Sequence, residues 1–232
     1  MNVEGSATPV NVMWTGGWDS TFRVLDLALC QHRQVQPHYV RRVARRSHGH
    51  EIAAMRAIHA LVRHRHGPEA AGRIAPLIVV EHATLTIPPR MRKWHRALRQ
   101  HYPLSPQYMF LHAYAAQAGL TDLELGVMQS DSLSDFLRPH LVAAGDGLIL
   151  AAKVRLPALA LMRPFRFPGL DLSKTEAGTR AEAAGFLPEM MLTHFCARPL
   201  ASGAPCGKCF PCEQAVAQGL GWRVPNDDWL AT

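Results

Sequence analysis

The sequence predicts an α/β fold in which a parallel sheet is covered by helices on both faces. Short apolar runs alternate with segments of helical periodicity along most of the chain, and a glycine turn joins the first run to the first helical segment. At 232 residues, with 48% apolar and 19% charged residues, the chain is long enough for one domain with a small appendage. Parallel sheets of this kind bind ligands at the carboxyl ends of their strands, near the point where the strand order reverses.

The first part of the chain predicts three strands and two helices. The strands are expected at residues 10–14, 35–40 and 76–80, where apolar residues form short runs. The helices are expected at residues 20–31 and 51–66, where apolar residues recur at helical spacing.

Further along, the same reasoning predicts three more helices and two more strands. The helices are expected at 107–118, 133–144 and 173–184, and the strands at 123–127 and 159–162. Pro139 disturbs the second of these helices. Ser173, with Glu176 three residues on, predicts a capping box at the start of the third.

From about residue 187 the composition changes, because proline and glycine become frequent and most of the cysteines gather there. The sequence therefore predicts two parts, a nucleotide-binding domain over residues 1–186 and a small cysteine-containing tail over residues 187–232.

The turn after the first strand has the composition of a phosphate-binding loop. It consists of Thr15, Gly16, Gly17, Trp18, Asp19 and Ser20, and Thr21 extends it. Adjacent glycines let the main chain approach an anion, and a helix N-terminus directs N–H groups toward it. The three hydroxyls add donors, and the Asp19 carboxylate can orient a metal ion or a water. The alternative is an ordinary tight turn with a serine or threonine N-cap. The run is neither a Walker A loop nor a dinucleotide fingerprint, because neither spacing is present.

Four cysteines near the C-terminal end have the spacing of metal ligands. Two overlapping Cys-x-x-Cys pairs share Cys209, and one further cysteine lies upstream, so that the set is Cys196, Cys206, Cys209 and Cys212. Four thiolates complete the tetrahedral shell of structural zinc. An iron–sulfur cluster or a redox-active pair remains an alternative. Cys30 is expected to be an ordinary buried thiol, and His194 needs no role as a ligand.

A net charge of +7 suits anionic partners, either nucleotides or nucleic acid. The cations form two clusters, which are Arg41, Arg42, Arg45, Arg46, His48 and His50, and then Arg90, Arg92, Lys93, His95, Arg96, Arg99 and His101. Each cluster is either a solvated surface or a phosphate-binding or RNA-binding one. The sequence shows neither an apolar run of membrane-spanning length nor a signal-peptide pattern, so a cytoplasmic protein is expected.

The glycine motif resembles the PP-loop, Ser-Gly-Gly-x-Asp-Ser, of the ATP pyrophosphatases, with Thr15 in place of serine. Together with the C-terminal cysteines, it resembles the 7-cyano-7-deazaguanine synthase family over residues 10–214. Three internal segments share the resemblance: Leu172-Ser173-Lys174-Thr175-Glu176, Thr193-His194-Phe195-Cys196, and Gly126-Val127 followed by Asp131 and Asp135.

The resemblance implies a Rossmann-like fold of the adenine nucleotide alpha hydrolase type with a zinc-binding tail. It also implies a ligase in which ATP adenylates a carboxylate, ammonia attacks to give an amide, and a second ATP leads to the nitrile. Asp19, Ser20 and Lys174 would then be catalytic, and the residues from Thr15 to Thr21 would bind ATP and Mg²⁺. Asp131 and Asp135 would contact the substrate, and the four cysteines would bind Zn²⁺. The expected partners are a small carboxylate and ammonia, and a homodimer is expected.

The loop that carries Asp131 and Asp135 is shorter than in that family, so a homologue acting on another carboxylate is an alternative. Two other functions also fit the sequence. One is a PP-loop enzyme that modifies tRNA, such as a thiolase, which the basic clusters favour. The other is a non-enzymatic zinc-ribbon module that binds nucleic acid.

Overall fold

The computed structural model describes residues 8–42, 46–129 and 132–225. Its seven-stranded sheet has the order β3-β2-β1-β4-β7-β6-β5, in which the first five strands are parallel and the last two antiparallel to their neighbours. The strands are β1 (Val10–Met13), β2 (Val35–Arg41), β3 (Ile78–Glu81), β4 (Leu123–Leu125), β5 (Leu141–Ala144), β6 (Gly147–Leu150) and β7 (Phe165–Phe167). The predicted α/β class with a Rossmann-like, mostly parallel sheet is confirmed.

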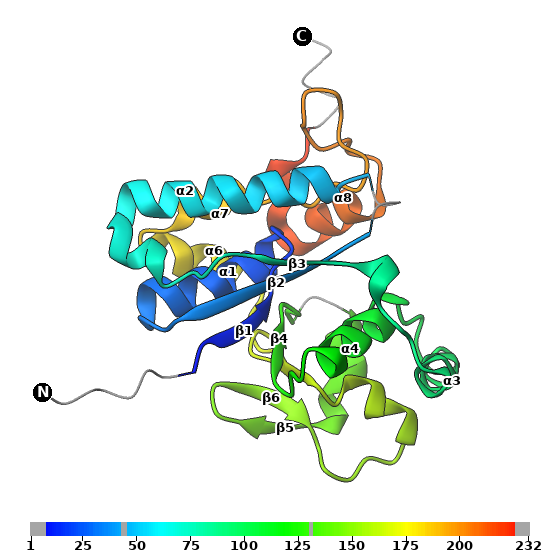
Figure 1. Cartoon of the computed structure of the whole chain (residues 1–232). Coiled ribbons are helices and arrows are strands. Elements are labelled where there is room, and N and C mark those ends of the chain that lie inside the picture. Colours follow the sequence, from blue (N-terminus) through cyan, green and yellow to red (C-terminus); the bar gives the residue numbers. More distant parts are fainter. Residues whose placement is uncertain (1–7, 43–45, 130–131, 226–232) are drawn as a thin grey trace, which may run out of the picture.

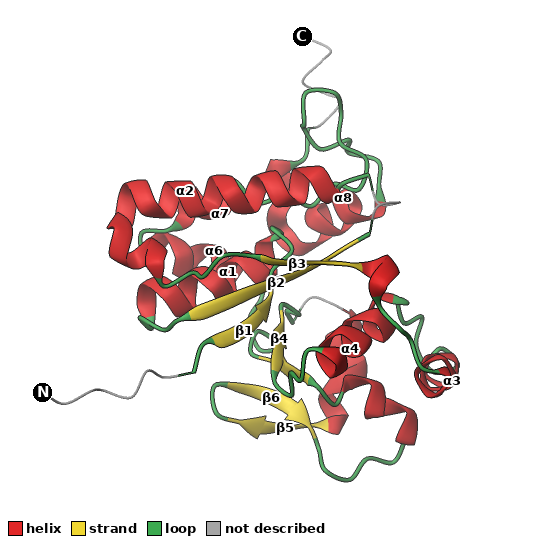
Figure 2. Ribbon diagram, in the orientation of Figure 1, coloured by secondary structure: helices red, strands yellow, loops and turns green. Residues whose placement is uncertain are grey.

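The helices lie on both sides of this sheet (Figures 1 and 2). They are α1 (Trp18–Leu25), α2 (His48–Gly72), α3 (Pro89–Leu98), α4 (Gln107–Gln117), α5 (Ser132–Leu137), α6 (Lys174–Ala183), α7 (Leu187–Met191) and α8 (Phe210–Ala215). The predicted capping box of α6 is confirmed, because Ser173 Oγ accepts a hydrogen bond from the Glu176 N–H and the Glu176 carboxylate accepts one from the Ser173 N–H.

Two hydrophobic cores lie on opposite faces of the sheet, and the alternation of β1 divides its side chains between them. Val12 is buried with α1, α2, α6 and α7, whereas Met13 is buried with α3, α4 and α5. The first core also contains the C-terminal segment: Cys196, Cys209, Cys212, Ala215, Leu220 and Val224. The tail therefore packs directly on the helices that follow the glycine loop. The division at residue 187 stays a prediction.

Two of the predicted elements are wrong. Residues 159–162 belong to a 3₁₀ helix, Pro157–Met162, and the strand comes later, at Phe165–Phe167. The helix expected over 133–144 ends at Leu137, because Pro139 interrupts it, and Leu141–Ala144 instead pairs with β6 as a hairpin. Helix α3 was not predicted, because its strongly basic sequence was interpreted only as a charge cluster.

Among the described residues, no helix is both long and apolar enough to cross a lipid bilayer.

Candidate functional site

The glycine motif forms the turn between β1 and α1, at the carboxyl end of the strand. Gly16 has φ +69°, and a Cβ there would lie 2.7 Å from the Glu51 carbonyl oxygen, so any other residue is excluded by both conformation and space. Gly17 is the N-cap of α1. The first N–H groups of an α-helix have no partner within the helix, so the start of α1 presents donors to this site.

The motif lies where the order of the sheet reverses. The chain goes from β1 outward through β2 to β3 and then returns to place β4 on the other side of β1. Gly126 follows β4, and a Cβ at this position would lie 2.7 Å from the Ser20 nitrogen. The lack of a side chain at Gly126 therefore lets the end of β4 lie against the first turn of α1.

A buried ion pair fixes α1 against β4. The Arg23 Nε and Nη2 atoms donate to the Glu124 carboxylate at 2.7 and 2.9 Å, and Nη2 also donates to Asp146 at 2.5 Å. Burial by itself would raise the pKa of the Asp146 carboxyl, but the Arg23 guanidinium outweighs it and lowers that pKa. The position of the helix start thus rests on a bidentate contact at the second turn of α1.

The hydroxyl groups of the motif point in two directions. Ser20 Oγ accepts from the Thr15 N–H at 3.2 Å and lies 3.2 Å from Thr15 Oγ1, on the cavity side. Thr21 is fully buried in the opposite direction, where its Oγ1 accepts from the Trp14 indole N–H at 2.9 Å. Two of the three hydroxyls therefore line the cavity.

Lys174, at the start of helix α6, contacts Asp19, the acidic residue of the motif. Its Nζ lies 2.8 and 3.0 Å from the two oxygens of the Asp19 carboxylate, and both side chains are 14% exposed. Trp18 helps to hold this arrangement, because its indole N–H donates to the Lys174 carbonyl oxygen at 3.1 Å and its ring packs against Gly178 of α6. Trp18 is 4% exposed, so most of its ring lies in the core.

A cavity of about 280 Å³ lies in front of the motif. Its walls come from the glycine loop, the ends of β1 and β4, the start of α4, Lys174 and the C-terminal tail. The polar lining residues that sequence analysis did not identify as site residues are Glu51, Gln107, Tyr108, Gln214 and Gln218. Glu51 is 3% exposed and accepts from Tyr39 Oη at 2.5 Å and from Ser47 Oγ at 2.8 Å. Nothing in the sequence distinguishes it from an ordinary acid in the first turn of a helix.

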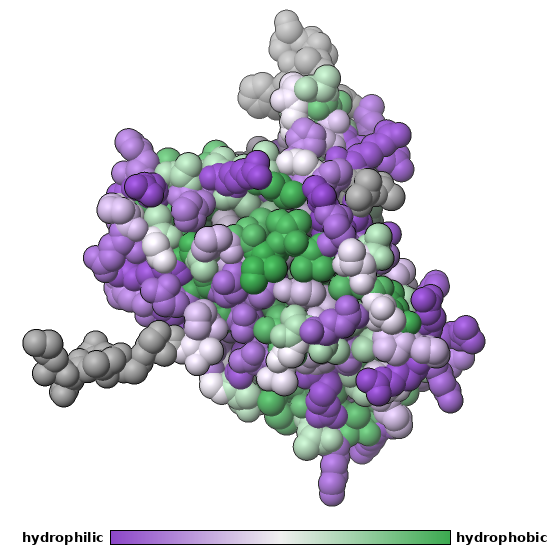
Figure 3. Space-filling view, in the orientation of Figure 1, coloured by the Kyte–Doolittle hydropathy of each residue, from purple (hydrophilic) through white to green (hydrophobic). Residues whose placement is uncertain are grey.

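A larger void of about 900 Å³ lies between α2 and the edge strand β3. Its lining includes Ile52, Met55, Leu77 and Val79 but no residue of the motif from Thr15 to Thr21. Figure 3 shows the corresponding hydrophobic patch over α2 and β3. The smaller cavity is the candidate site, because it alone of the two brings the motif together with Lys174.

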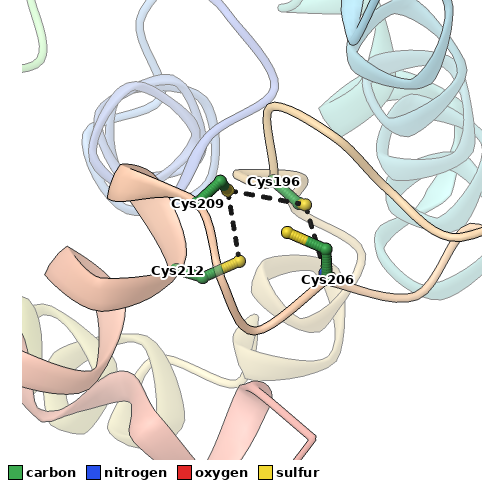
Figure 4. A group of neighbouring side chains, drawn as sticks. All are labelled: Cys196, Cys206, Cys209 and Cys212. Atoms are coloured by element: carbon green, nitrogen blue, oxygen red, sulfur yellow. Dashed lines mark hydrogen bonds between the residues drawn. The ribbon is translucent and has the colours of Figure 1, made fainter.

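The four C-terminal cysteines converge on one point (Figure 4). All their sulfur atoms lie within 4.8 Å of one another, with 3.8 Å from Cys196 to Cys209 and 3.5 Å from Cys209 to Cys212. Zinc–sulfur bonds of about 2.3 Å in a tetrahedron place the sulfurs about 3.8 Å apart, so the set fits a tetrahedral ion. Burial acts to raise the pKa of Cys209, but hydrogen bonds from the backbone of Ala197 and Cys212 lower it to about 7. The cluster can therefore hold a metal ion.

Of the remaining candidates, His194 lines the cavity, whereas Asp135 and Cys30 do not. Asp131 lies outside the described residues, and Asp135 is exposed in α5. Cys30 is exposed at the end of the π-helical turn that extends α1, so the expectation of a buried thiol is wrong. His194 Nε2 lies 2.8 Å from the Cys196 carbonyl oxygen, and His194 is not one of the clustered ligands.

Two arginines of the first basic cluster have partners among the described residues. Arg41 pairs with Glu81, and Arg42 lies over the Phe110 ring at 5.5 Å. Arg45 lies outside the described residues.

No protein-family model matches this chain, and no curated protein matches it. Among solved structures, the chain is similar to a 4-thiouridine synthetase in complex with RNA and with bound ATP, with a TM-score of 0.41 and 16% sequence identity. The match covers 94% of this chain and 50% of that one, so the chain spans about half of that protein's length. A TM-score this low carries no argument about function, which is inferred from the chemistry of the site.

Proposed function

We propose that this protein is an ATP-dependent ligase of the PP-loop type, which activates a carboxylate and releases AMP and pyrophosphate. The observation that carries the proposal is the convergence of the glycine loop, the start of α1 and Lys174 on one cavity at the switch point of the sheet. The hydroxyls of Thr15 and Ser20, the N–H groups at the start of α1 and the Lys174 ammonium lie around this cavity. The pyrophosphate that leaves in such a reaction requires donors and a cation of this kind.

In this proposal, the N–H groups at the start of α1 bind the phosphate chain together with the hydroxyls of Thr15 and Ser20. The Lys174 ammonium neutralises charge that develops on pyrophosphate as it leaves. Asp19 holds Lys174 in position before the nucleotide binds, because its carboxylate contacts the ammonium directly. Gly16 and Gly17 contribute by keeping side chains away from the anion.

Asp19 also fits a role toward Mg²⁺, because Asp19 lines the cavity and a carboxylate oxygen is the kind of ligand that this ion prefers. Glu51 lines the same cavity and offers a second carboxylate. When bound, Mg²⁺ would neutralise phosphate charge.

The reaction that we propose has four steps, two that form the amide and two that form the nitrile. A carboxylate oxygen attacks the α-phosphorus of ATP, which forms an acyl adenylate and expels pyrophosphate. Ammonia then attacks the acyl carbon, and AMP leaves while the nitrogen loses a proton, so that the product is an amide. The amide oxygen then attacks the α-phosphorus of a second ATP and expels a second pyrophosphate, and loss of AMP, with both protons lost from the nitrogen over these two steps, gives the nitrile.

The finer proposal is that the carboxylate is 7-carboxy-7-deazaguanine, as the resemblance of the motif, of the Lys174 segment and of the cysteine spacing implies. In the same proposal, the four cysteines bind a structural Zn²⁺, which leaves no open position for chemistry.

The decisive experiment incubates zinc-loaded protein with ATP, Mg²⁺, ammonia and 7-carboxy-7-deazaguanine and follows the products by mass spectrometry. Formation of the 7-cyano product with AMP and pyrophosphate would establish both the ligase activity and its substrate, 7-carboxy-7-deazaguanine. Exchange of labelled pyrophosphate into ATP with another carboxylate, and none with this one, would keep the ligase and reject the deazapurine. Absence of exchange with every acid in a broad panel would contradict the ligase itself.

A further inference from the structure

Helix α3 presents an unusual concentration of positive charge. Arg90, Arg92, Lys93, Arg96 and Arg99 are all exposed, and the chain contains neither aspartate nor glutamate between Glu81 and Asp122. Within the described part of the chain, no ion pair joins any of these five cations to an acid. Figure 3 shows hydrophilic residues where α3 lies at the periphery of Figure 1.

The cations lie on one side of the helix because the opposite side anchors it. Met91, His95 and Leu98 are buried in the second core. Arg92, Arg96 and Arg99 follow one another at spacings of four and three residues, which places them in one exposed row. At a rise of about 1.5 Å per residue, this row is about 10 Å long.

The first turn of α3 carries charge of the sign that destabilises a helix. The positive end of the helix dipole lies at the N-terminus and favours acids, yet the first turn contains no acid and includes Arg90 and Arg92. A bound anion would relieve this repulsion. The electrostatics of the isolated helix therefore point, independently of the missing ion pairs, to an anionic ligand.

The residues on this surface favour a polyanion over a membrane or a folded protein. Insertion into a membrane requires a wide exposed apolar side, but Met91 and Leu98 are buried and the Trp94 ring is partly buried against the protein. The row formed by Arg92, Arg96 and Arg99 contains no apolar side chain that could be the centre of an interface with a folded protein, and competition by polyglutamate tests the remaining case of an acidic polypeptide. A polyanion needs only the charged row, and guanidinium groups match phosphate in a bidentate manner.

We propose that α3 is a docking surface for the phosphate backbone of single-stranded nucleic acid. Arg90 lies over the Trp94 ring at 5.9 Å, which places a planar cation and an aromatic ring side by side, as in surfaces that accept unpaired bases. From α3 the chain runs directly to Gln107 at the start of α4, which lines the cavity. This inference goes beyond the proposed ligase activity and stands on separate residues.

The test measures fluorescence anisotropy of a labelled 20-nucleotide single-stranded RNA between 50 and 200 mM KCl. Three phosphate contacts predict a slope of log K against log salt of roughly −2. The double variant R92E/R96E should weaken binding at least about tenfold and flatten the slope. The matched control R56E/R63E changes the net charge equally on α2, where both arginines are exposed, and should have a much smaller effect.

Three outcomes would overturn the proposal. They are equal losses in both double variants, equal competition by polyglutamate, and tighter binding to a duplex of the same length. Circular dichroism and metal content check folding, and R92A/R96A provides a milder change that should weaken binding in the same direction. ATP–pyrophosphate exchange should survive in R92E/R96E, whereas K174A should still bind RNA, so failure of the ligase proposal and failure of this one are distinguishable.

Discussion

Lys174 is the cation of the candidate site, and its contact with Asp19 makes a direct prediction. Replacing Lys174 by alanine should lower ATP–pyrophosphate exchange about a hundredfold, because the leaving pyrophosphate loses its compensating charge. The matched control is Lys153→Ala, since Lys153 is exposed and does not line the cavity. Exchange that is equal in the two variants would contradict the role of Lys174.

Thr15 and Thr21 bracket the same motif but face opposite ways, so their variants should separate function from stability. Thr15→Val should reduce exchange and leave unfolding nearly unchanged. Thr21→Val should leave exchange nearly intact and lower the free energy of unfolding by about 1 kcal/mol, because the Trp14 indole N–H loses its buried acceptor. Urea denaturation and exchange assays on both variants check this, and the reversed pattern would place the phosphates on the other side of the loop.

His38 should make the protein acid-sensitive. It is 3% exposed in β2, where Nε2–H donates to Asn11 Oδ1 at 2.9 Å and Nδ1 accepts from Tyr114 Oη at 2.5 Å, and burial lowers its pKa to about 4. Between the unfolded pKa of about 6.5 and this value, the unfolded state binds more protons, so stability falls as the pH falls.

The loss due to His38 should reach about 3 kcal/mol at pH 4. Urea denaturation at a series of pH values measures it, and His38→Gln should reduce the slope over this range. His64→Gln is the control, because His64 is exposed. An unchanged slope in His38→Gln would assign the acid sensitivity to other groups.

At the scale of elements, the contact between β4 and α1 depends on Gly126. A methyl group there would lie 2.7 Å from the Ser20 nitrogen and 2.9 Å from its Cα, so Gly126→Ala must move the start of the helix. We expect about 1–3 kcal/mol of destabilisation and a loss of exchange. Gly72→Ala is the control, because a Cβ there meets nothing within 4 Å, and it should be neutral or stabilising. Equal behaviour of the two variants would show that the contact is not critical.

The elements that sequence analysis predicted well are those whose periodicity is unambiguous. The strands on either side of the first helix and helix α4 fall where apolar spacing placed them, and α6 falls where its capping box placed it. Helix α2 was also predicted, but it extends six residues beyond the predicted end, across a kink at Gly67. The hairpin of β5 and β6 was missed because Leu141–Ala144 is an apolar run too short to distinguish from a helix end. Helix α3 was missed because Met91 and Leu98 are too few apolar residues, in a segment rich in cations, to give a clear helical periodicity.

Prediction of the candidate site from the sequence was limited to features that are local in the chain. The motif and the clustering cysteines could be recognised from spacing, since both are local in sequence. The contact of Lys174 with Asp19 joins segments 155 residues apart, and Glu51 enters the cavity because of where α2 packs. Long-range packing of this kind leaves no periodic signal in the sequence.

At the scale of the whole molecule, the cysteine cluster should control stability well beyond the tail. Three of its four residues belong to the same buried core as Trp18 and the helices around it. Removal of the metal with a chelator, or Cys212→Ser, should therefore lower the Tm of the entire protein by several degrees, because metal binding is coupled to folding. Calorimetry and elemental analysis check this, with Cys30→Ser as the control that retains metal. A Tm unaffected by metal removal would contradict a structural role.

The segments that form the walls of the cavity are synthesised at different times. A ribosome produces the glycine loop about two hundred residues before Pro211, Gln214, Gln218 and Leu220. At roughly 5–20 residues per second, about 10–40 s separate the two events during synthesis. During that interval the nascent chain lacks part of the wall of the cavity. If the cavity binds ATP as proposed, the nucleotide stabilises the protein only after the cysteine tail has been synthesised, and earlier steps of folding proceed without the ligand.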